Sequence, residues 1–273
     1  MITLSQQQLA QYRNEGFLVL SAHEHKCLVD PSVLQQWSDE VREWPLTESK
    51  GKWMPYFEDR SDGTRQIMRT ERFMEYHDGF KALLDGDALT GILKQLNGQD
   101  MLLFKDKINY KLPGGGGFAA HLDAPAYDHI SKIEHVTANI AIHPANAANG
   151  CLEVVPGSHQ NKVDFIFGGQ ITPEWCSAHE WVSVPLAVGD ILFFGSHLAH
   201  RSGPNTSTKP RAMLYATYAG ASDGKDLREK YYAHRRKAFP PDHEREVGVD
   251  YSDGWKTYAF AAPFSKQGVG ITV

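Results

Sequence analysis

The sequence is poor in cysteine and has no long apolar stretch. Its three cysteines, Cys27, Cys151 and Cys176, form no C-x-x-C pair. We therefore expect neither a disulfide framework nor a cysteine zinc site, and we predict a reducing, cytoplasmic location. No run of 18 or more apolar residues occurs, so a membrane span is not expected. The first residues lack a basic segment followed by an apolar one, and we expect no signal peptide.

Excess positive charge is also absent. The 28 lysines and arginines are outnumbered by 33 acidic residues, which gives a formal net charge of −5. Nucleic acids and anionic membranes attract concentrated basic charge, so neither is an expected partner. Hydrophobic residues make up 41% of the chain, as in ordinary soluble proteins. We expect a small-molecule ligand and one domain over 1–273. The sequence does not decide between a monomer and a homodimer.

The first hundred residues favour helices. Ser5 and Gln8 have capping-box spacing, and Gly16 is suited to end the helix that they begin. A short strand is predicted next, at 17–20, and the polar, aromatic segment 48–70 is expected to be irregular or short-stranded. Within it, Trp53, Tyr56 and Phe57 are assigned to core packing, with a pocket wall as the alternative. Further helices are predicted over 32–44, 74–84 and 88–96.

From residue 101 the pattern changes to short strands separated by glycine and proline. Several such strands after helices indicate a mainly β fold with flanking helices, in which two sheets form a jelly roll, or double-stranded β-helix. The helical flank is placed at about 1–100, the jelly-roll core at about 101–220 and a C-terminal extension at 221–273. Strands are predicted at 101–111, 135–142, 151–155, 181–185, 189–194 and 211–218.

Two polar patterns have competing interpretations. Lys105, Lys107, Asn109 and Lys111 share one side of the strand at 101–111, which usually means solvent but here favours a wet cavity for some of them. The charged run 228–236 is predicted to be a solvated helix face. The tail 258–264 is expected to pack on the core and close the pocket.

The chemistry centres on His121 and Asp123. On a strand, residues i and i+2 point to the same side, so both side chains can reach one metal ion. A second histidine would complete a 2-His-1-carboxylate triad with open coordination positions. His200 and His197 are the candidates, and we favour His200. Arg211, eleven positions beyond His200, offers a planar fork for a carboxylate, and the hydroxyl of Ser202 adds a donor.

These motifs together resemble the phytanoyl-CoA dioxygenase family of non-haem Fe(II), 2-oxoglutarate-dependent oxygenases. The matching segments are His121-x-Asp123, the turn 149–159, the strand 189–194, and 200–205 followed by Arg211. They cover about 101–220, and the N-terminal helix leading into 16–19 is also similar.

The resemblance implies the role of each site residue. His121, Asp123 and His200 would bind Fe(II) and carry catalysis. Arg211 and Ser202, with Asn109, would bind 2-oxoglutarate. With O2, the products would be succinate, CO2 and a hydroxylated substrate. The carboxylate of Asp123 favours hydroxylation over halogenation, because related halogenases have a small residue there.

The substrate prediction depends on two further segments. The segments 51–54 and 107–112 resemble those of 2-aminoethylphosphonate-type hydroxylases, and a small polar metabolite suits a pocket near Lys107, Tyr127 and His129. Tailoring of a natural product, such as a mycosporine-like amino acid or a terpenoid, is the alternative, since the fold does not choose a substrate.

Two functions from other classes are alternatives. A cupin-type isomerase or metal-binding protein would share the jelly roll but would turn over no 2-oxoglutarate. A zinc hydrolase that uses His197 and His200 would need a general base beside the metal, and no H-E-x-x-H arrangement occurs.

Overall fold

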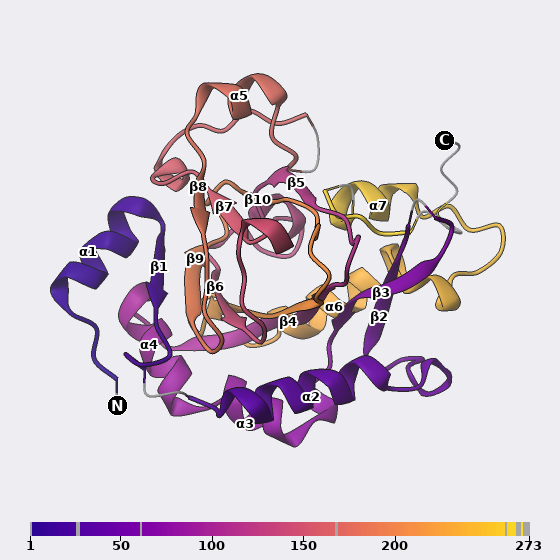
Figure 1. Ribbon diagram of the computed structural model, residues 1–273, viewed down its shortest axis with the longest axis horizontal. Coiled ribbons are helices and arrows are strands. Elements are labelled where there is room, and N and C mark those ends of the chain that lie inside the picture. The colour runs from indigo at the N-terminus through magenta and orange to yellow at the C-terminus, as the bar shows by residue number, and fades with distance from the viewer. Residues whose placement is uncertain are drawn as a thin grey trace.

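Two antiparallel sheets face each other in the computed structural model, which describes residues 2–25, 28–60, 62–166, 169–259, 261–265 and 269 (Figure 1). The larger sheet has the order β1 (Phe17–Leu20), β9 (Ile191–Gly195), β6 (Val136–Ala141), β11 (Arg211–Gly220), β4 (Met101–Lys111), β3 (Arg65–Glu71) and β2 (Met54–Asp59). The smaller sheet has the order β5 (Phe118–His121), β10 (His200–Ser202), β7 (Leu152–Val154) and β8 (Val182–Val184). The predicted jelly roll is confirmed.

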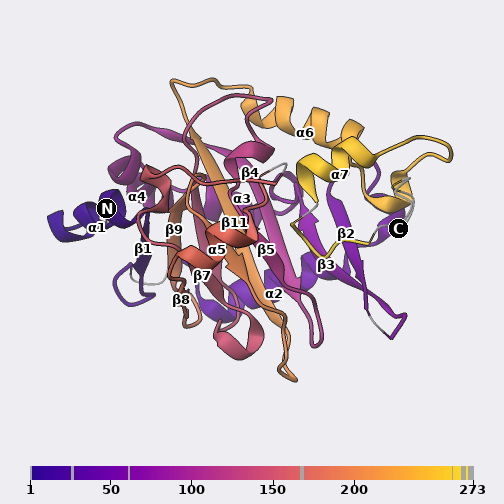
Figure 2. The same cartoon turned by 90° about the horizontal axis from the view of Figure 1, so that it is seen from above.

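The N-terminal segment supplies strands as well as helices. Helix α1 (Gln6–Glu15) has the predicted capping box of Ser5 and Gln8, and Gly16 ends it in the left-handed conformation. Strand β1 then pairs with β9, and the segment expected to be irregular or short-stranded forms the hairpin of β2 and β3. In Figures 1 and 2, α1 lies at one end of the molecule and the C-terminal segment lies at the other, beside β2 and β3.

Three helices cover the outer face of the larger sheet. Helices α2 (Pro31–Glu43) and α3 (Asp78–Leu84) run beneath β4 in Figure 1, with α4 (Asp87–Asn97) beside them. Apolar side chains of the helices and of alternate strand positions form one buried cluster there, including Leu34, Phe80, Ile108, Ile140 and Leu214. Since side chains alternate along a strand, the intervening residues of the same strands face the smaller sheet.

The helix predicted over 74–84 is divided in two. Residues Met74–Tyr76 form the short 3-10 helix η2, and α3 begins only at Asp78. The backbone of His77 is extended between them, and its ring nitrogen accepts from the N–H of Phe80, which caps α3. The other short 3-10 helices are η1 (Leu46–Glu48), η3 (Ala124–Ala126), η4 (Ala147–Asn149), η5 (Ser158–Gln160) and η6 (Asp242–Glu244).

The core assignment of Trp53 and Tyr56 is confirmed, because both are buried among apolar side chains away from the cavity described below; Phe57 is half-buried. Helix α5 (Pro173–Ala178) was not predicted, although Thr172 followed by Pro173 is a start signal. The Thr172 hydroxyl accepts from the N–H of Trp175.

Residues 228–236, predicted to be a solvated helix face, lie in helix α6 (Leu227–Ala238), and the prediction is wrong for the side of this helix that is buried. Tyr231, Tyr232 and Arg235 of this helix have no exposed surface. The guanidinium of Arg235 pairs with Glu71 and lies over the ring of Tyr56, which offsets the cost of burying its charge.

The C-terminal tail packs on the core, as expected, and Phe260 lies outside the described residues. Helix α7 (Ser252–Tyr258) packs on α6, where the ring centroids of Tyr258 and Tyr231 are 5.9 Å apart. Beyond it, the carbonyl of Ala261 accepts from the N–H of Ala119, and the N–H of Ser265 donates to Phe57.

The buried His25 makes the stability of the fold depend on pH. Its Nε2–H donates to the carbonyl of Gly189, and its Nδ1 accepts from the N–H of Leu28, so the bonded ring is neutral. Burial lowers the pKa of His25. As the pH falls, His25 therefore becomes protonated in the unfolded chain before it does so in the folded protein. The contribution of the neutral ring to the free energy of unfolding is complete above pH ~6.5 and is lost as the pH falls toward the folded pKa.

We expect the free energy of unfolding to drop below pH ~6.5 by up to about 1.4 kcal/mol per pH unit for this group. Urea denaturation of the protein and of His25→Gln between pH 7.5 and 5 measures the effect. The variant should have the flatter profile, and equal slopes would contradict the assignment.

Candidate active site

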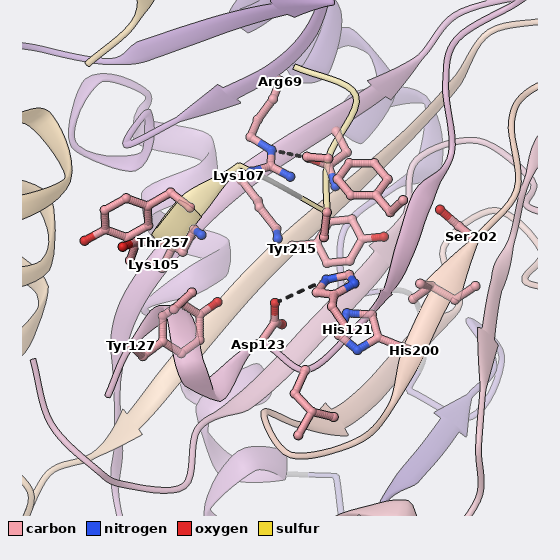
Figure 3. A pocket seen from close by; sticks show the side chains of 18 residues that line it. Arg69, Lys105, Lys107, His121, Asp123, Tyr127, His200, Ser202, Tyr215 and Thr257 are labelled. Carbon is pink, nitrogen blue, oxygen red and sulfur yellow. Dashed lines mark hydrogen bonds and ion pairs between the residues drawn. The ribbon is translucent and has the colours of Figure 1, made fainter. Parts of the chain in front are cut away.

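Two histidines and one aspartate converge between the sheets. His121 ends β5 and His200 begins β10, and the two residues are direct partners across this antiparallel pair. Their ring centroids are 4.2 Å apart, and His121 Nε2 lies 3.8 Å from Asp123 Oδ1. One potential ligand atom from each of the three residues lies within 4.8 Å of the others (Figure 3). Strand pairing therefore joins ligands from distant parts of the sequence.

The prediction that Asp123 lies on the same strand as His121 is wrong. This residue lies beyond the end of β5, and its backbone is in the right-handed helical region as the chain turns into η3. Its N–H donates to the carbonyl of Ser196 at 3.1 Å. The carboxylate therefore approaches His121 through a turn, and not through the alternation of a strand.

Backbone carbonyls fix the orientation of both rings. The Nδ1–H of His121 donates to Ala119 at 2.7 Å, and the Nδ1–H of His200 donates to Leu198 at 2.9 Å. A carbonyl can only accept, so each ring keeps an unprotonated Nε2 that is available to a metal.

The charge states also suit a metal. Burial, with the neighbouring His200, lowers the pKa of His121 to about 3. Burial opposes ionisation of Asp123, but the positive charge of Lys107 outweighs this and holds the pKa of the carboxyl below its ordinary value. Two neutral imidazoles and one carboxylate are the donor set that non-haem Fe(II) oxygenases use, so the residues present fit this ion.

The rival histidine lies outside the cluster. The Nδ1 of His197 is 3.3 Å from Glu134 Oε1, and its side chain is 39% exposed. The choice of His200 over His197 agrees with this geometry. It also removes the pair of ligands on which the zinc-hydrolase alternative depends.

A cavity beside the three ligands has a cationic floor. Lys105, Lys107 and Asn109 of β4 and Arg69 of β3 line it (Figure 3). The interpretation of the polar face of β4 as the wall of a wet cavity is therefore confirmed for these positions. Its other walls come from β5, η3, the smaller sheet, β11 and the C-terminal segment: Phe118, Leu122, Ala126, Tyr127, Leu152, Ser202, Tyr215, Thr257, Tyr258, Ala261 and Ala262.

A buried carboxylate lies behind this floor. Glu71 Oε1 accepts from Arg69 Nη1 at 3.0 Å and from Arg235 Nη2 at 2.9 Å. Arg69 Nε donates to Asn109 Oδ1 at 2.7 Å. Burial opposes the ionisation of Glu71, but Arg235, followed by Lys105 and Arg69, lowers its pKa to about 2. The network holds the guanidinium of Arg69 at the edge of the cavity.

A second cationic group lies beside Ser202. Lys111 Nζ donates to Ser202 Oγ at 2.9 Å and to the carbonyl of Gly203 at 2.5 Å, and Arg211 Nη1 donates to the carbonyl of Gly150 at 3.0 Å. Ser202 lines the cavity, whereas Arg211 is buried and is not among the lining residues. Sequence reasoning noted Lys111 on the polar face of β4 but gave it no role.

The residues predicted to meet the substrate lie in different places. Lys107 and Tyr127 line the cavity, and Tyr127 is buried. His129 is not among the lining residues. Its Nε2 lies 2.7 Å from the hydroxyl of Tyr258, which is also 2.7 Å from His234 Nδ1. His129 thus contacts the cavity wall from behind, and its predicted role in substrate binding stays a prediction.

Sequence reasoning gave no site role to five polar lining residues: Arg69, Lys105, Tyr215, Thr257 and Tyr258. Lys105 and Tyr215 were noted on shared strand faces, and that alternation could have placed both in the cavity. The position of Arg69 depends on pairing between β3 and β4, which no local pattern reveals.

Known proteins resemble this chain in sequence and in fold. The sequence profile of the family described as phytanoyl-CoA dioxygenase (PhyH) matches residues 12–213. The chain belongs to the phytanoyl-CoA dioxygenase family. The predicted family and the predicted enzyme class, a dioxygenase, are confirmed by this match and by the relatives below.

Curated relatives span most of the chain. A 2-aminoethylphosphonate dioxygenase from the uncultured bacterium HF130_AEPn_1 is 35% identical over 96% of this chain and 99% of its own. A methylphosphonate hydroxylase from Gimesia maris is 39% identical over 87% of this chain and 88% of its own. A dioxygenase from Epichloe uncinata, lolE1, is 38% identical over 88% and 92%.

Two solved structures have folds similar to that of this chain. EctD from S. alaskensis, with 2-oxoglutarate and 5-hydroxyectoine, superposes with a TM-score of 0.68 at 19% identity, over 81% of this chain and 77% of its own. The carbocyclase SnoK from nogalamycin biosynthesis gives 0.64 at 22% identity, over 80% and 85%. Among the described residues, no helix is long and apolar enough to cross a membrane.

Proposed function

We propose that this dioxygenase uses Fe(II) and 2-oxoglutarate to hydroxylate a C–H bond of a small polar metabolite, and that the metabolite is a phosphonate. The observation that carries the proposal is the group of His121, Asp123 and His200 facing a cavity whose floor is cationic. Two relatives that span most of the chain are named for phosphonates, which supports the substrate class. The cationic floor suits the anionic phosphonate group better than an uncharged natural product such as a terpenoid.

Fe(II) with 2-oxoglutarate and O2 supplies an oxidant strong enough for an unactivated C–H bond, and succinate and CO2 are released. In our proposal His121, Asp123 and His200 hold the ion through two Nε2 atoms and a carboxylate oxygen. Lys107, with the neighbouring cations of the floor, holds the anionic end of the substrate. The apolar wall, which includes Phe118 and Leu122, excludes water from the reacting carbon.

The co-substrate is proposed to occupy the Ser202 end of the cavity. Arg211 would hold its distal carboxylate with help from the hydroxyl of Ser202, and Asn109 would contact it from the floor. Lys111 is added to this set, because its ammonium already donates to Ser202 Oγ. The two cations side by side suit a dicarboxylate better than a neutral ligand.

The proposal also covers the organisation of this chain. We infer one catalytic domain over 1–273, since strands from 1–100 complete the sheet that forms the cavity floor. A cytoplasmic location and a small-molecule partner belong to the same proposal; a homodimer stays an open expectation. Free Cys151 and Cys176 are consistent with a reducing compartment.

The test is a set of parallel incubations with Fe(II), O2, 2-oxoglutarate and methyl-, ethyl- or 2-aminoethylphosphonate. Succinate is measured by chromatography and the product by 31P NMR. With at least one of these phosphonates, we expect succinate and hydroxylated phosphonate in equal amounts. A cupin-type isomerase or binding protein would release no succinate, and that result would overturn the proposal.

Replacing Arg211 with alanine should chiefly weaken 2-oxoglutarate. A lost charge-assisted pair costs roughly 2–5 kcal/mol, so KM for 2-oxoglutarate should rise by at least about thirtyfold. Steady-state succinate release at varied 2-oxoglutarate measures this change. KM for the phosphonate should change far less.

Arg201→Ala is the matched control. Arg201 lies between His200 and Ser202 in sequence, but it points the other way, and its Nε donates to Glu153 at 2.7 Å. This variant should keep the KM of the unaltered enzyme. An unchanged KM in Arg211→Ala would contradict the proposed anchor.

A further inference from the structure

The floor of the cavity carries more basic side chains than the two nearby carboxylates, Asp123 and Glu71, can offset. Lys105 and Lys107 are 5% and 8% exposed, and both line the cavity. Within the described part of the chain, no hydrogen bond or ion pair reaches either ammonium. Their close contacts are rings: Lys105 lies 5.4 Å from the centroid of Tyr127, and Lys107 lies 4.8 Å from that of Tyr215. Two buried lysine amines without acceptors in the protein leave hydrogen-bond donors that an anionic ligand would satisfy.

Arg69 adds a third cation at the same place. Its Nε and Nη1 are bound to Asn109 and Glu71, which fixes the plane of the guanidinium beside the two lysines. The three side chains come from adjacent strands, β3 and β4, and Figure 3 shows them around one space in front of Asp123. This arrangement suits a tetrahedral dianion, whose three oxygens each accept hydrogen bonds.

Acidic groups are nearly absent from the same cavity. Asp123, the proposed iron ligand, is the only aspartate or glutamate among the described lining residues. Glu71 lies behind the floor, where Arg69 and Arg235 already bind it. No residue outside the described part is an acid in the sequence. Apart from the proposed iron ligand Asp123, the cavity therefore offers no carboxylate to a cation on the substrate.

We propose that Lys105, Lys107 and Arg69 form the phosphonate subsite, and that the remainder of the substrate is uncharged or anionic, as in an alkylphosphonate, and is not an aminoalkyl group. This inference rests on the proposed function and narrows its substrate class. The wall available to the rest of the substrate consists of Phe118, Ala126, Ala261 and Ala262 with the hydroxyl of Thr257. An ammonium there would lose its hydration without gaining an acidic partner, and would lie near the three cations.

Propylphosphonate and 2-aminoethylphosphonate separate charge from size. They have the same chain length, and a terminal methyl in one replaces the ammonium in the other. Each is titrated by calorimetry into the enzyme loaded with Fe(II) and 2-oxoglutarate under anaerobic conditions. We expect propylphosphonate to bind at least about tenfold more tightly, since an unpaired buried charge costs more than 1.4 kcal/mol. Inorganic phosphate, as a competitor, measures the head group alone.

The outcomes distinguish this inference from the function on which it rests. Tighter or equal binding of 2-aminoethylphosphonate would overturn the exclusion of amines and leave phosphonate hydroxylation intact. If neither phosphonate binds, the phosphonate class fails and the subsite fails with it. If both bind but Lys105→Met leaves both affinities unchanged in a folded protein, the assignment of the subsite is overturned.

A new carboxylate in the wall should reverse the preference. Thr257 lines the cavity from the end of α7, and its hydroxyl donates only to the helix carbonyl of Asp253. In Thr257→Asp, the ratio of the two affinities should shift toward 2-aminoethylphosphonate by about tenfold. In Thr257→Asn, the new side chain has the shape of aspartate but no charge, so this variant should keep the original ratio of the two affinities. Equal shifts in both variants would show that size governs the choice, and would overturn the argument from charge.

Discussion

Asp123→Ala is expected to abolish Fe(II)-dependent release of succinate while the fold is kept. The carboxylate is the single anionic donor of the proposed iron site, and it lies 3.8 Å from His121 Nε2. Changes to groups that merely support a ligand reduce metal affinity or activity by roughly 10–100-fold, so loss of a ligand should exceed about a hundredfold. Iron binding by equilibrium dialysis and succinate release by chromatography measure the two effects separately.

Asp128→Ala is the matched control, because Asp128 follows on the same segment but is exposed and does not line the cavity. It should retain iron and activity. Circular dichroism should show that both variants are folded. Undiminished turnover by Asp123→Ala would reject the triad.

Glu71→Gln is expected to have the largest effect on stability. The carboxylate has no exposed surface and binds Arg69 and Arg235, and the latter is also fully buried. The amide keeps the shape of the side chain but leaves two guanidinium groups without a counter-charge. Removing one partner of a buried ion pair costs about 3–5 kcal/mol. Urea denaturation measures the change in the free energy of unfolding.

An exposed ion pair provides the comparison. Glu229 lies 3.1 Å from Arg72, and its side chain is 66% exposed. Glu229→Gln should cost less than about 1 kcal/mol, since water already screens that pair. Similar losses in the two variants would mean that the buried network behaves like a surface contact, and would remove the support proposed for the cavity floor.

Local sequence patterns predicted most elements because local chemistry decides them. The capping box of Ser5 and Gln8 fixed the start of α1, and alternation along 101–111 identified β4 with both of its ends. The same alternation placed Lys107 and Asn109 on one face. What alternation does not specify is whether that face meets water or a second sheet, since this depends on strands far away in the sequence.

The predictions that were wrong concern features that depend on contacts between residues far apart in the sequence. The turn at Asp123 follows from a hydrogen bond to Ser196, a residue more than seventy positions away. The burial of Arg235 requires Glu71 from another strand, and a charged helix face carries no mark of such a partner. The metal ligands were recognisable because the motif spacing is specific, whereas the floor cation Arg69 was not.

The two sheets carry different parts of the proposed chemistry. His121 and His200 are neighbours on the smaller sheet, and the cations of the cavity floor belong to the larger one. Substitutions on β3 and β4 can therefore alter which compound is accepted without moving the histidines that hold the oxidant. Descendants of such a protein could acquire new substrates one strand at a time, with the oxidation step inherited unchanged.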